Sequence, residues 1–215
     1  MKYKISNNKS SKIQEIDNKK LFNIYYKKAT EQEDMDSQYN LGYMYEKGIG
    51  VNKNIVEAIK WYTKAGEQGD VTAQYILGAI YESGLGIEKD YKKAVKWYTK
   101  AAEQGDADAQ YDLGCMYRNG LGVLKDNKEA VKWYTKSADQ GESIAQANLG
   151  YMYANGLGVE KDYKKAMKWY KEAAIQGDRT AQNNLGYMYE NGLGVEKDKE
   201  EATKWYKKAY TKRDL

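Results

Sequence analysis

A stretch of fifteen residues recurs along the chain and decides the fold. Residues 184–198 read NLGYMYENGLGVEKD, and residues 148–162 read NLGYMYANGLGVEKD, which is the same text 36 residues earlier with one change. The same step separates all the tryptophans: Trp61, Trp97, Trp133, Trp169 and Trp205. A fixed period of this length is typical of repeat proteins, in which each repeat is one supersecondary unit. The sequence therefore predicts five 36-residue repeats, at about residues 35–70, 71–106, 107–142, 143–178 and 179–214.

The glycines within this stretch raise the alternative of a phosphate-binding loop. Such a loop occurs once, between a strand and a helix, and is followed by Lys-Ser/Thr or by a third glycine. Here the pair Gly192 and Gly194 follows a helical pattern, precedes Val-Glu-Lys-Asp, and has an equivalent in every repeat. We therefore expect these glycines to be structural.

Each repeat is predicted to form two helices, as residues 70–106 illustrate. Asp70 is placed to cap a first helix (helix A, TAQYILGAIYES), because an N-cap carboxylate accepts from backbone N–H groups that have no other partner. Gly84 follows that helix, where a left-handed glycine often ends one. Asp90 caps a second helix (helix B, YKKAVKWYTKAAEQ), which Gly105 ends. In three repeats a glutamate three residues after the helix-B cap predicts a capping box: Glu57, Glu129 and Glu201.

Two columns of the repeat predict close packing between helices. Gly78 lies in the middle of helix A, in a column that is glycine in all five repeats, although glycine there costs about 1 kcal/mol relative to alanine. We expect two backbones to approach closely at this position. A recurring glutamine predicts a buried hydrogen bond to a neighbouring loop: Gln38, Gln74, Gln110, Gln146 and Gln182.

The chain before the first repeat carries half of the pattern. Tyr25 falls in the tryptophan column, and Tyr26 and Ala29 fall in the tyrosine and alanine columns that follow it. One lone helix B is therefore expected to start near residue 17, in front of the five helix pairs. Residues 1–16 are polar and are expected to form a disordered tail. The predicted organisation is that tail and then a single all-α solenoid over residues 17–215.

The repeat pattern resembles the Sel1-like repeat, a relative of the tetratricopeptide repeat. It runs A-Q-x-x-L-G-x-M-Y-x-x-G-x-G-V-x-x-D-x-x-x-A-x-K-W-Y-x-K-A-A-x-Q-G-D and covers about residues 17–210. The resemblance implies an α-solenoid wound as a right-handed superhelix, with the A helices lining a concave face. It also implies a non-catalytic scaffold or adaptor that binds a peptide or protein segment on that face.

The concave face is the predicted partner-binding surface, because its columns vary between repeats while the core columns do not. Asparagines there can hydrogen-bond a peptide backbone, and tyrosines supply large, rigid contact area. The alternative is an ordinary polar surface. The candidate partner-binding residues are Asn40, Tyr43, Ile76, Asp112, Asn148, Tyr151, Asn155, Asn184, Tyr187 and Asn191.

Composition narrows the function further. The chain has 35 basic and 31 acidic residues, and a net charge of +4 is too small to indicate a nucleic-acid surface. There is no histidine, the commonest general base and transition-metal ligand. We therefore expect no catalytic residue, no metal and no cofactor. Neither a signal peptide nor an apolar span of about 20 residues is visible, so we expect an intracellular, cytoplasmic monomer that binds neither nucleic acid nor membrane.

Two other functions stay open. Cysteine-rich secreted bacterial relatives are linked to β-lactam hydrolysis, but their paired cysteines have no counterpart here, where Cys115 is the single cysteine. Without a histidine to activate it, Cys115 is interpreted as a packing or groove residue. The chain could instead be a structural spacer or an oligomerisation module.

Overall fold

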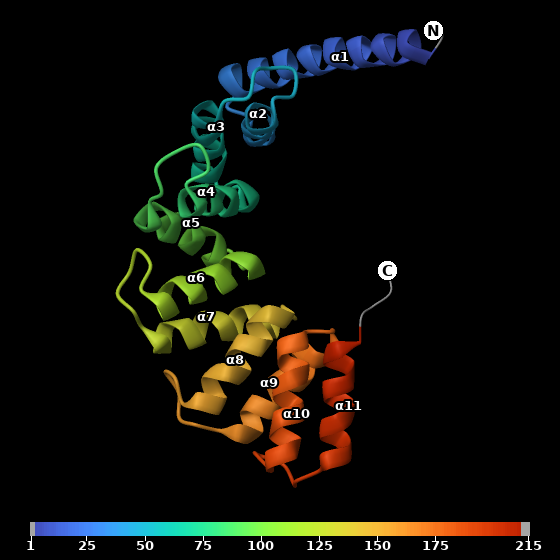
Figure 1. Ribbon diagram of the computed structural model, residues 1–215. Coiled ribbons are helices and arrows are strands. Elements are labelled where there is room, and N and C mark those ends of the chain that lie inside the picture. The colour runs from blue at the N-terminus through green and yellow to red at the C-terminus, as the bar shows by residue number, and fades with distance from the viewer. Residues whose placement is uncertain (1–2, 212–215) are drawn as a thin grey trace. The chain divides into compact units, whose positions relative to one another are not determined.

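The regular secondary structure of the described residues is helical. The computed structural model describes residues 3–211, with side chains from residue 14 onward. Residues 1–2 and 212–215, which the sequence analysis assigned to the tail and to the end of the solenoid, lie outside the described residues. Within residues 3–211 the helices are, in order (Figure 1), α1 (Tyr3–Glu31), α2 (Met35–Lys47), α3 (Ile55–Glu67), α4 (Val71–Ser83), α5 (Tyr91–Glu103), α6 (Ala107–Asn119), α7 (Asn127–Asp139), α8 (Ser143–Asn155), α9 (Tyr163–Ile175), α10 (Arg179–Asn191) and α11 (Lys199–Tyr210).

The helices form hairpins that pack in chain order. The chain divides into two compact units, an N-terminal unit that ends at Gln104 and a C-terminal unit that begins at Gly105. The A helices are α2, α4, α6, α8 and α10, each paired with the B helix that follows it. Inside each unit a B helix also packs against the next A helix, as α3 does on α4 and α9 on α10. The predicted α-solenoid of helix-turn-helix repeats is confirmed. The single domain over residues 17–215 stays a prediction.

The core of each hairpin is a tyrosine ring laid on a glycine. Tyr98 on α5 is fully buried, and a Cβ placed on Gly78 would lie 2.5 Å from its Cε1 atom. The expected close approach therefore exists, but the partner of the glycine is an aromatic ring and not a second backbone. The periodic tryptophans also belong to the core, since four of them are buried and Trp169 is half-buried.

Helix ends follow the predicted chemistry, with one correction. Asp126 caps α7 and accepts from the backbone N–H of Glu129 at 3.1 Å. The predicted capping box is nevertheless wrong in its second half. The backbone N–H of Asp126 donates to the carbonyl oxygen of Tyr117 at 2.9 Å, and the Glu129 carboxylate instead pairs with Lys132. The preceding A helix thus supplies the acceptor that the glutamate would have provided.

The recurring glutamines connect successive hairpins. Gln74 is buried, and its Nε2 donates to the carbonyl oxygen of Gly66 at the end of the preceding B helix, at 2.7 Å. Its Oε1 accepts from Nε2 of Gln104 at 2.8 Å. Gln146 makes the same pair of bonds, to Ala138 and from Gln176. The predicted buried hydrogen bond is thus confirmed, but its acceptor is the last turn of the preceding B helix and not a loop.

The N-terminal helix is longer than expected. Helix α1 begins at Tyr3, so residues 3–16 are helical where the sequence analysis expected a disordered tail and a helix start near residue 17. The physical reason lies in the sequence of this segment, which contains no glycine and no proline that would end a helix. The half-repeat is confirmed further along, because Ala29 is buried and Phe22 and Tyr25 pack in the same cluster.

Candidate functional site

The predicted partner-binding residues all lie on A helices, and the structure divides them by exposure. Tyr43, Tyr151 and Tyr187 are exposed, at 41%, 43% and 55%. Asn155 and Asn191 are also exposed. The remaining candidates are half-buried: Asn40, Ile76, Asp112, Asn148 and Asn184.

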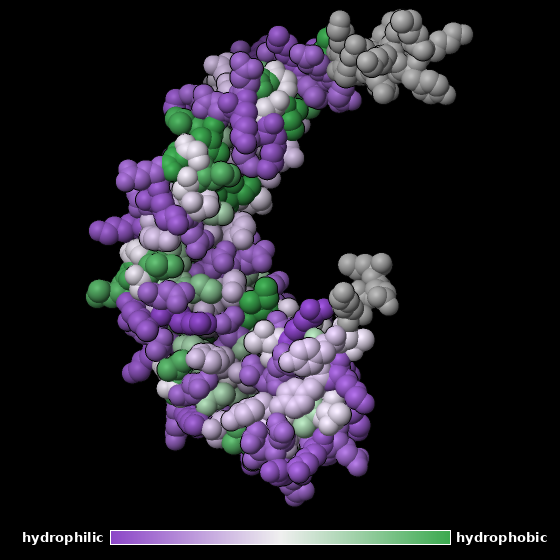
Figure 2. Space-filling view, in the orientation of Figure 1, coloured by the Kyte–Doolittle hydropathy of each residue, from purple (hydrophilic) through white to green (hydrophobic). Residues whose placement is uncertain are grey.

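The structure brings five of these residues together in the C-terminal unit. Asn148, Tyr151 and Asn184 line a hollow of about 310 Å³, called here the arginine hollow because Arg118 also lines it. A second hollow of about 290 Å³, the tyrosine hollow, is lined by Tyr151 and Asn184 again, together with Asn155 and Tyr187. Two shared residues make the hollows neighbours along α8 and α10. Hydrophilic and intermediate residues cover most of the face of this unit that Figure 2 shows.

Other candidates are placed elsewhere. In the N-terminal unit Tyr43 and Ile76 line a hollow of about 350 Å³ between α2 and α4. Asn40, Asp112 and Asn191 are not among the residues that line these three hollows. The sequence already placed six of the ten candidates in the last two repeats, and five of these six line the two adjoining hollows there.

Arg118 is the functional candidate that the sequence reasoning missed. Its Nη1 donates to Oδ1 of Asn148 at 2.6 Å, and its guanidinium lies 5.7 Å from the ring centre of Tyr151. Asn148 in turn donates from Nδ2 to the carbonyl oxygen of Ile144 at 2.9 Å. A signal existed in the sequence, because Arg118 stands in a column where three other repeats have glutamate: Glu46, Glu82 and Glu190.

The asparagines of this face are held by their own helix. Nδ2 of Asn155 donates to the carbonyl oxygen of Tyr151, and Nδ2 of Asn191 donates to that of Tyr187, at 2.9 and 2.8 Å. Each bond spans one helical turn and fixes the amide, so that Oδ1 is directed away from that carbonyl. An amide oxygen is an acceptor with two lone pairs. The face is therefore suited to receive N–H donors.

Comparison with known proteins identifies the family. The Sel1 repeat model matches residues 36–70, 71–106, 107–142, 143–178 and 180–214. The chain belongs to the Sel1 repeat family. No curated protein matched this Sel1 repeat chain.

Solved structures agree with this assignment. A Sel1 repeat protein from Oxalobacter formigenes is 39% identical with a TM-score of 0.80, and the match covers 92% of this chain and 83% of that one. A protective antigen present in uropathogenic Escherichia coli strains is 42% identical with a TM-score of 0.81 over 87% of this chain, and the chain spans 40% of the antigen's length. An immunity protein from Pseudomonas aeruginosa shares the fold, with 22% sequence identity and a TM-score of 0.51. The match covers 90% of this chain and 74% of the immunity protein.

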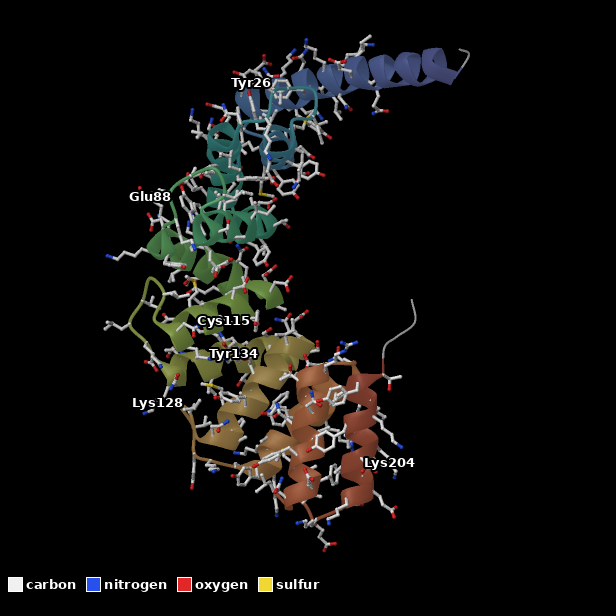
Figure 3. The ribbon with its side chains drawn as sticks, viewed as in Figure 1. Tyr26, Glu88, Cys115, Lys128, Tyr134 and Lys204 are labelled. Atoms are coloured by element: carbon white, nitrogen blue, oxygen red, sulfur yellow. The ribbon has the colours of Figure 1, made fainter. Side chains whose placement is uncertain are left out.

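Sel1 repeat proteins are in general protein-interaction scaffolds and typically non-enzymatic. Cys115 in this member is half-buried, and Oη of Tyr134 donates to its Sγ at 3.2 Å; the two residues lie together on α6 and α7 (Figure 3). Burial raises the pKa of the Cys115 thiol, which disfavours the reactive thiolate. The geometry matches the packing role expected for this residue.

In the described part of this Sel1 repeat chain, no three His, Cys, Asp or Glu residues are grouped so as to hold a metal ion. None of the described helices combines the length and the apolar character that crossing a membrane requires.

Proposed function

We propose that this chain is a protein-interaction scaffold that binds an extended segment of a protein partner along α8 and α10. The observation that carries the proposal is the pair of adjoining hollows, which share Tyr151 and Asn184. Each hollow lies at the low end of the volumes of small-molecule pockets, about 300 Å³, and is suited to single side chains of a partner.

The chemistry of the strip supports a peptide ligand. Tyr151 and Tyr187 are exposed, in contrast to the helix-B tyrosines Tyr62, Tyr98 and Tyr134, which are buried. Exposed tyrosines contribute interface area at low cost in side-chain entropy. Backbone N–H groups of an extended segment can donate to the fixed amide oxygens of Asn155 and Asn191. Family membership supports the same role, because Sel1 repeat proteins are generally scaffolds.

The test is partner capture by two matched variants. One carries Asn148→Ala, Asn184→Ala and Tyr187→Ala in the C-terminal unit, and the control carries Asn40→Ala and Tyr43→Ala on α2. Proteins that the wild type captures from a lysate are identified by mass spectrometry, purified, and titrated against all three proteins by calorimetry. We expect the triple variant to bind at least about tenfold more weakly, a loss of about 1.4 kcal/mol, and the control to bind as the wild type does.

Circular dichroism establishes that both variants remain folded. Equal affinity of the folded triple variant and the wild type would contradict the placement on α8 and α10. Self-association without any captured protein would favour the spacer or oligomerisation function instead.

A further inference from the structure

The helix-B tyrosines that follow the tryptophans share one hydrogen-bonding arrangement. Each ring lies on the glycine of its own A helix, and in three repeats its hydroxyl reaches a residue one turn further along that helix. In three repeats the acceptor is a glutamate sixteen residues before the tyrosine, at 2.9, 2.8 and 3.0 Å: Tyr62 to Glu46, Tyr98 to Glu82 and Tyr206 to Glu190. In the third repeat the glutamate is replaced by Arg118, and Tyr134 donates to Cys115 instead.

Tyr170 is the exception in this column. The residue sixteen positions earlier is Ala154, which has no side-chain acceptor. Tyr170 is only 3% exposed, but it lines the tyrosine hollow, and its hydroxyl is not one of the polar atoms sealed in the core without a partner. The fourth repeat therefore lacks the glutamate that accepts from the equivalent tyrosine in three other repeats.

The missing carboxylate coincides with a cavity. Tyr170 and Ala154 both line the tyrosine hollow, so the hollow occupies the position where the other repeats place a glutamate. Lys161, the charged residue among those that line this hollow, lies with its Nζ 4.7 Å from the ring centre of Tyr163, which lines it too. The arginine hollow differs, because Arg118 there is accompanied by Asp178. The tyrosine hollow thus combines the Tyr170 hydroxyl with one charged lining residue, Lys161.

We propose that the tyrosine hollow binds the carboxylate of a glutamate or aspartate side chain of the protein partner. The incoming carboxylate accepts from the Tyr170 hydroxyl, as Glu46 and Glu82 do from their tyrosines, and the Lys161 ammonium favours its charge. This inference rests on the proposed function and names the residue type that anchors the partner.

The hydroxyl is available as a donor under ordinary conditions. Burial raises the pKa of Tyr170, so the hydroxyl keeps its proton at neutral pH. Exposed Tyr151 and Tyr187 flank the hollow, and they can cover the methylene groups of an acidic side chain while its carboxylate reaches inward. A protonated or amide side chain would lack the charge that Lys161 favours.

The decisive variant supplies the missing glutamate. Ala154→Glu restores the arrangement of the other repeats and fills the hollow from within, and should unfold at the same or a higher urea concentration than the wild type. Tyr170→Phe keeps the ring and removes only the donor. Glu82→Gln on α4 is the matched control, because it changes the same column in the N-terminal unit.

The probe is a short glycine-serine peptide with one central glutamate, blocked at both ends, and its glutamine counterpart. Binding is followed by amide chemical shifts of the full chain, at residues such as Ala154 and Leu193 that line the hollow. We expect saturable shifts with the glutamate peptide and at least about fivefold weaker binding of the glutamine peptide, about 1 kcal/mol. Ala154→Glu and Tyr170→Phe should lose the shifts, and Glu82→Gln should keep them.

Three results would overturn the assignment. The first is equal binding of the glutamate and glutamine peptides, and the second is chemical-shift changes that survive in folded Ala154→Glu. The third is equal shift changes with acetate at the same concentration, because these would indicate a site for free carboxylates. The scaffold proposal is decided separately. A captured partner that is lost by the Asn148/Asn184/Tyr187 variant and retained by Ala154→Glu would contradict the acidic anchor alone.

Discussion

The glycine of the A helix provides the sharpest test of the packing. Helix propensity alone predicts that Gly78→Ala raises the free energy of unfolding by about 1 kcal/mol, provided that the methyl group has room. The structure leaves none, because the new Cβ would lie 2.5 Å from Cε1 of Tyr98 and the ring is fully buried. Overpacking of this kind costs up to about 3 kcal/mol. Moving the ring also weakens the 2.8 Å hydrogen bond from Tyr98 to Glu82, worth about 1 kcal/mol.

The sum predicts that Gly78→Ala lowers the free energy of unfolding by about 3 kcal/mol. The assay is urea unfolding followed by circular dichroism and tryptophan fluorescence. Gly66→Ala on α3 is the control, because its Cβ would meet Gln74 and Trp97 at 3.2 Å and the same column already holds alanine in other repeats. It should be neutral or stabilising by up to about 1 kcal/mol. A Gly78→Ala protein within about 0.5 kcal/mol of the wild type would refute the packing argument.

Three further predictions concern caps, the thiol and the tyrosines. Glu142 is the A-helix N-cap that makes no side-chain cap hydrogen bond, so Glu142→Asp should stabilise by about 0.5–2 kcal/mol in urea unfolding, and no gain would contradict this. Because burial raises the pKa of Cys115, iodoacetamide at pH 8 should alkylate the native thiol at least about tenfold more slowly than the urea-unfolded one, and equal rates would count against burial. Burial also raises the pKa of Tyr134, and burial with the Glu190 hydrogen bond raises that of Tyr206 to about 12. Their stabilising contribution is complete below the unfolded pKa of about 10 and is lost as the pH rises through the folded values, so the urea midpoint should fall between about pH 10 and about pH 12.

The repeat architecture could be predicted because its contacts are local and are made again in each copy. Asp70 and Gly84 mark the ends of α4 by their own backbone chemistry, and the helix-B caps do so for the other half. The errors have two causes, and only the first involves a second element. The Tyr117 carbonyl replaces half of the Glu129 capping box, and α1 continues through residues 3–16 because nothing in that segment stops it.

The candidate site was predictable only in part. Exposure of Tyr151 and Tyr187 follows from their place opposite the leucine column. The significance of Arg118 and Ala154 was visible in the sequence only as two departures from a glutamate column. Their meaning required knowing that this column receives the hydroxyl of a buried tyrosine sixteen residues later.

The sequence by itself determined the period, the helix pairs, their ends and the family, because these depend on backbone preferences and on contacts that every repeat makes again. The tertiary structure decided which side chains meet across helices. It placed Tyr170 beside Ala154 and set Tyr151 on α8 next to Asn184 on α10, around shared hollows. Periodicity specifies the face on which a side chain lies. A tyrosine hydroxyl that lacks its glutamate, and the hollow beside it, depend on what the neighbouring helix brings to that face.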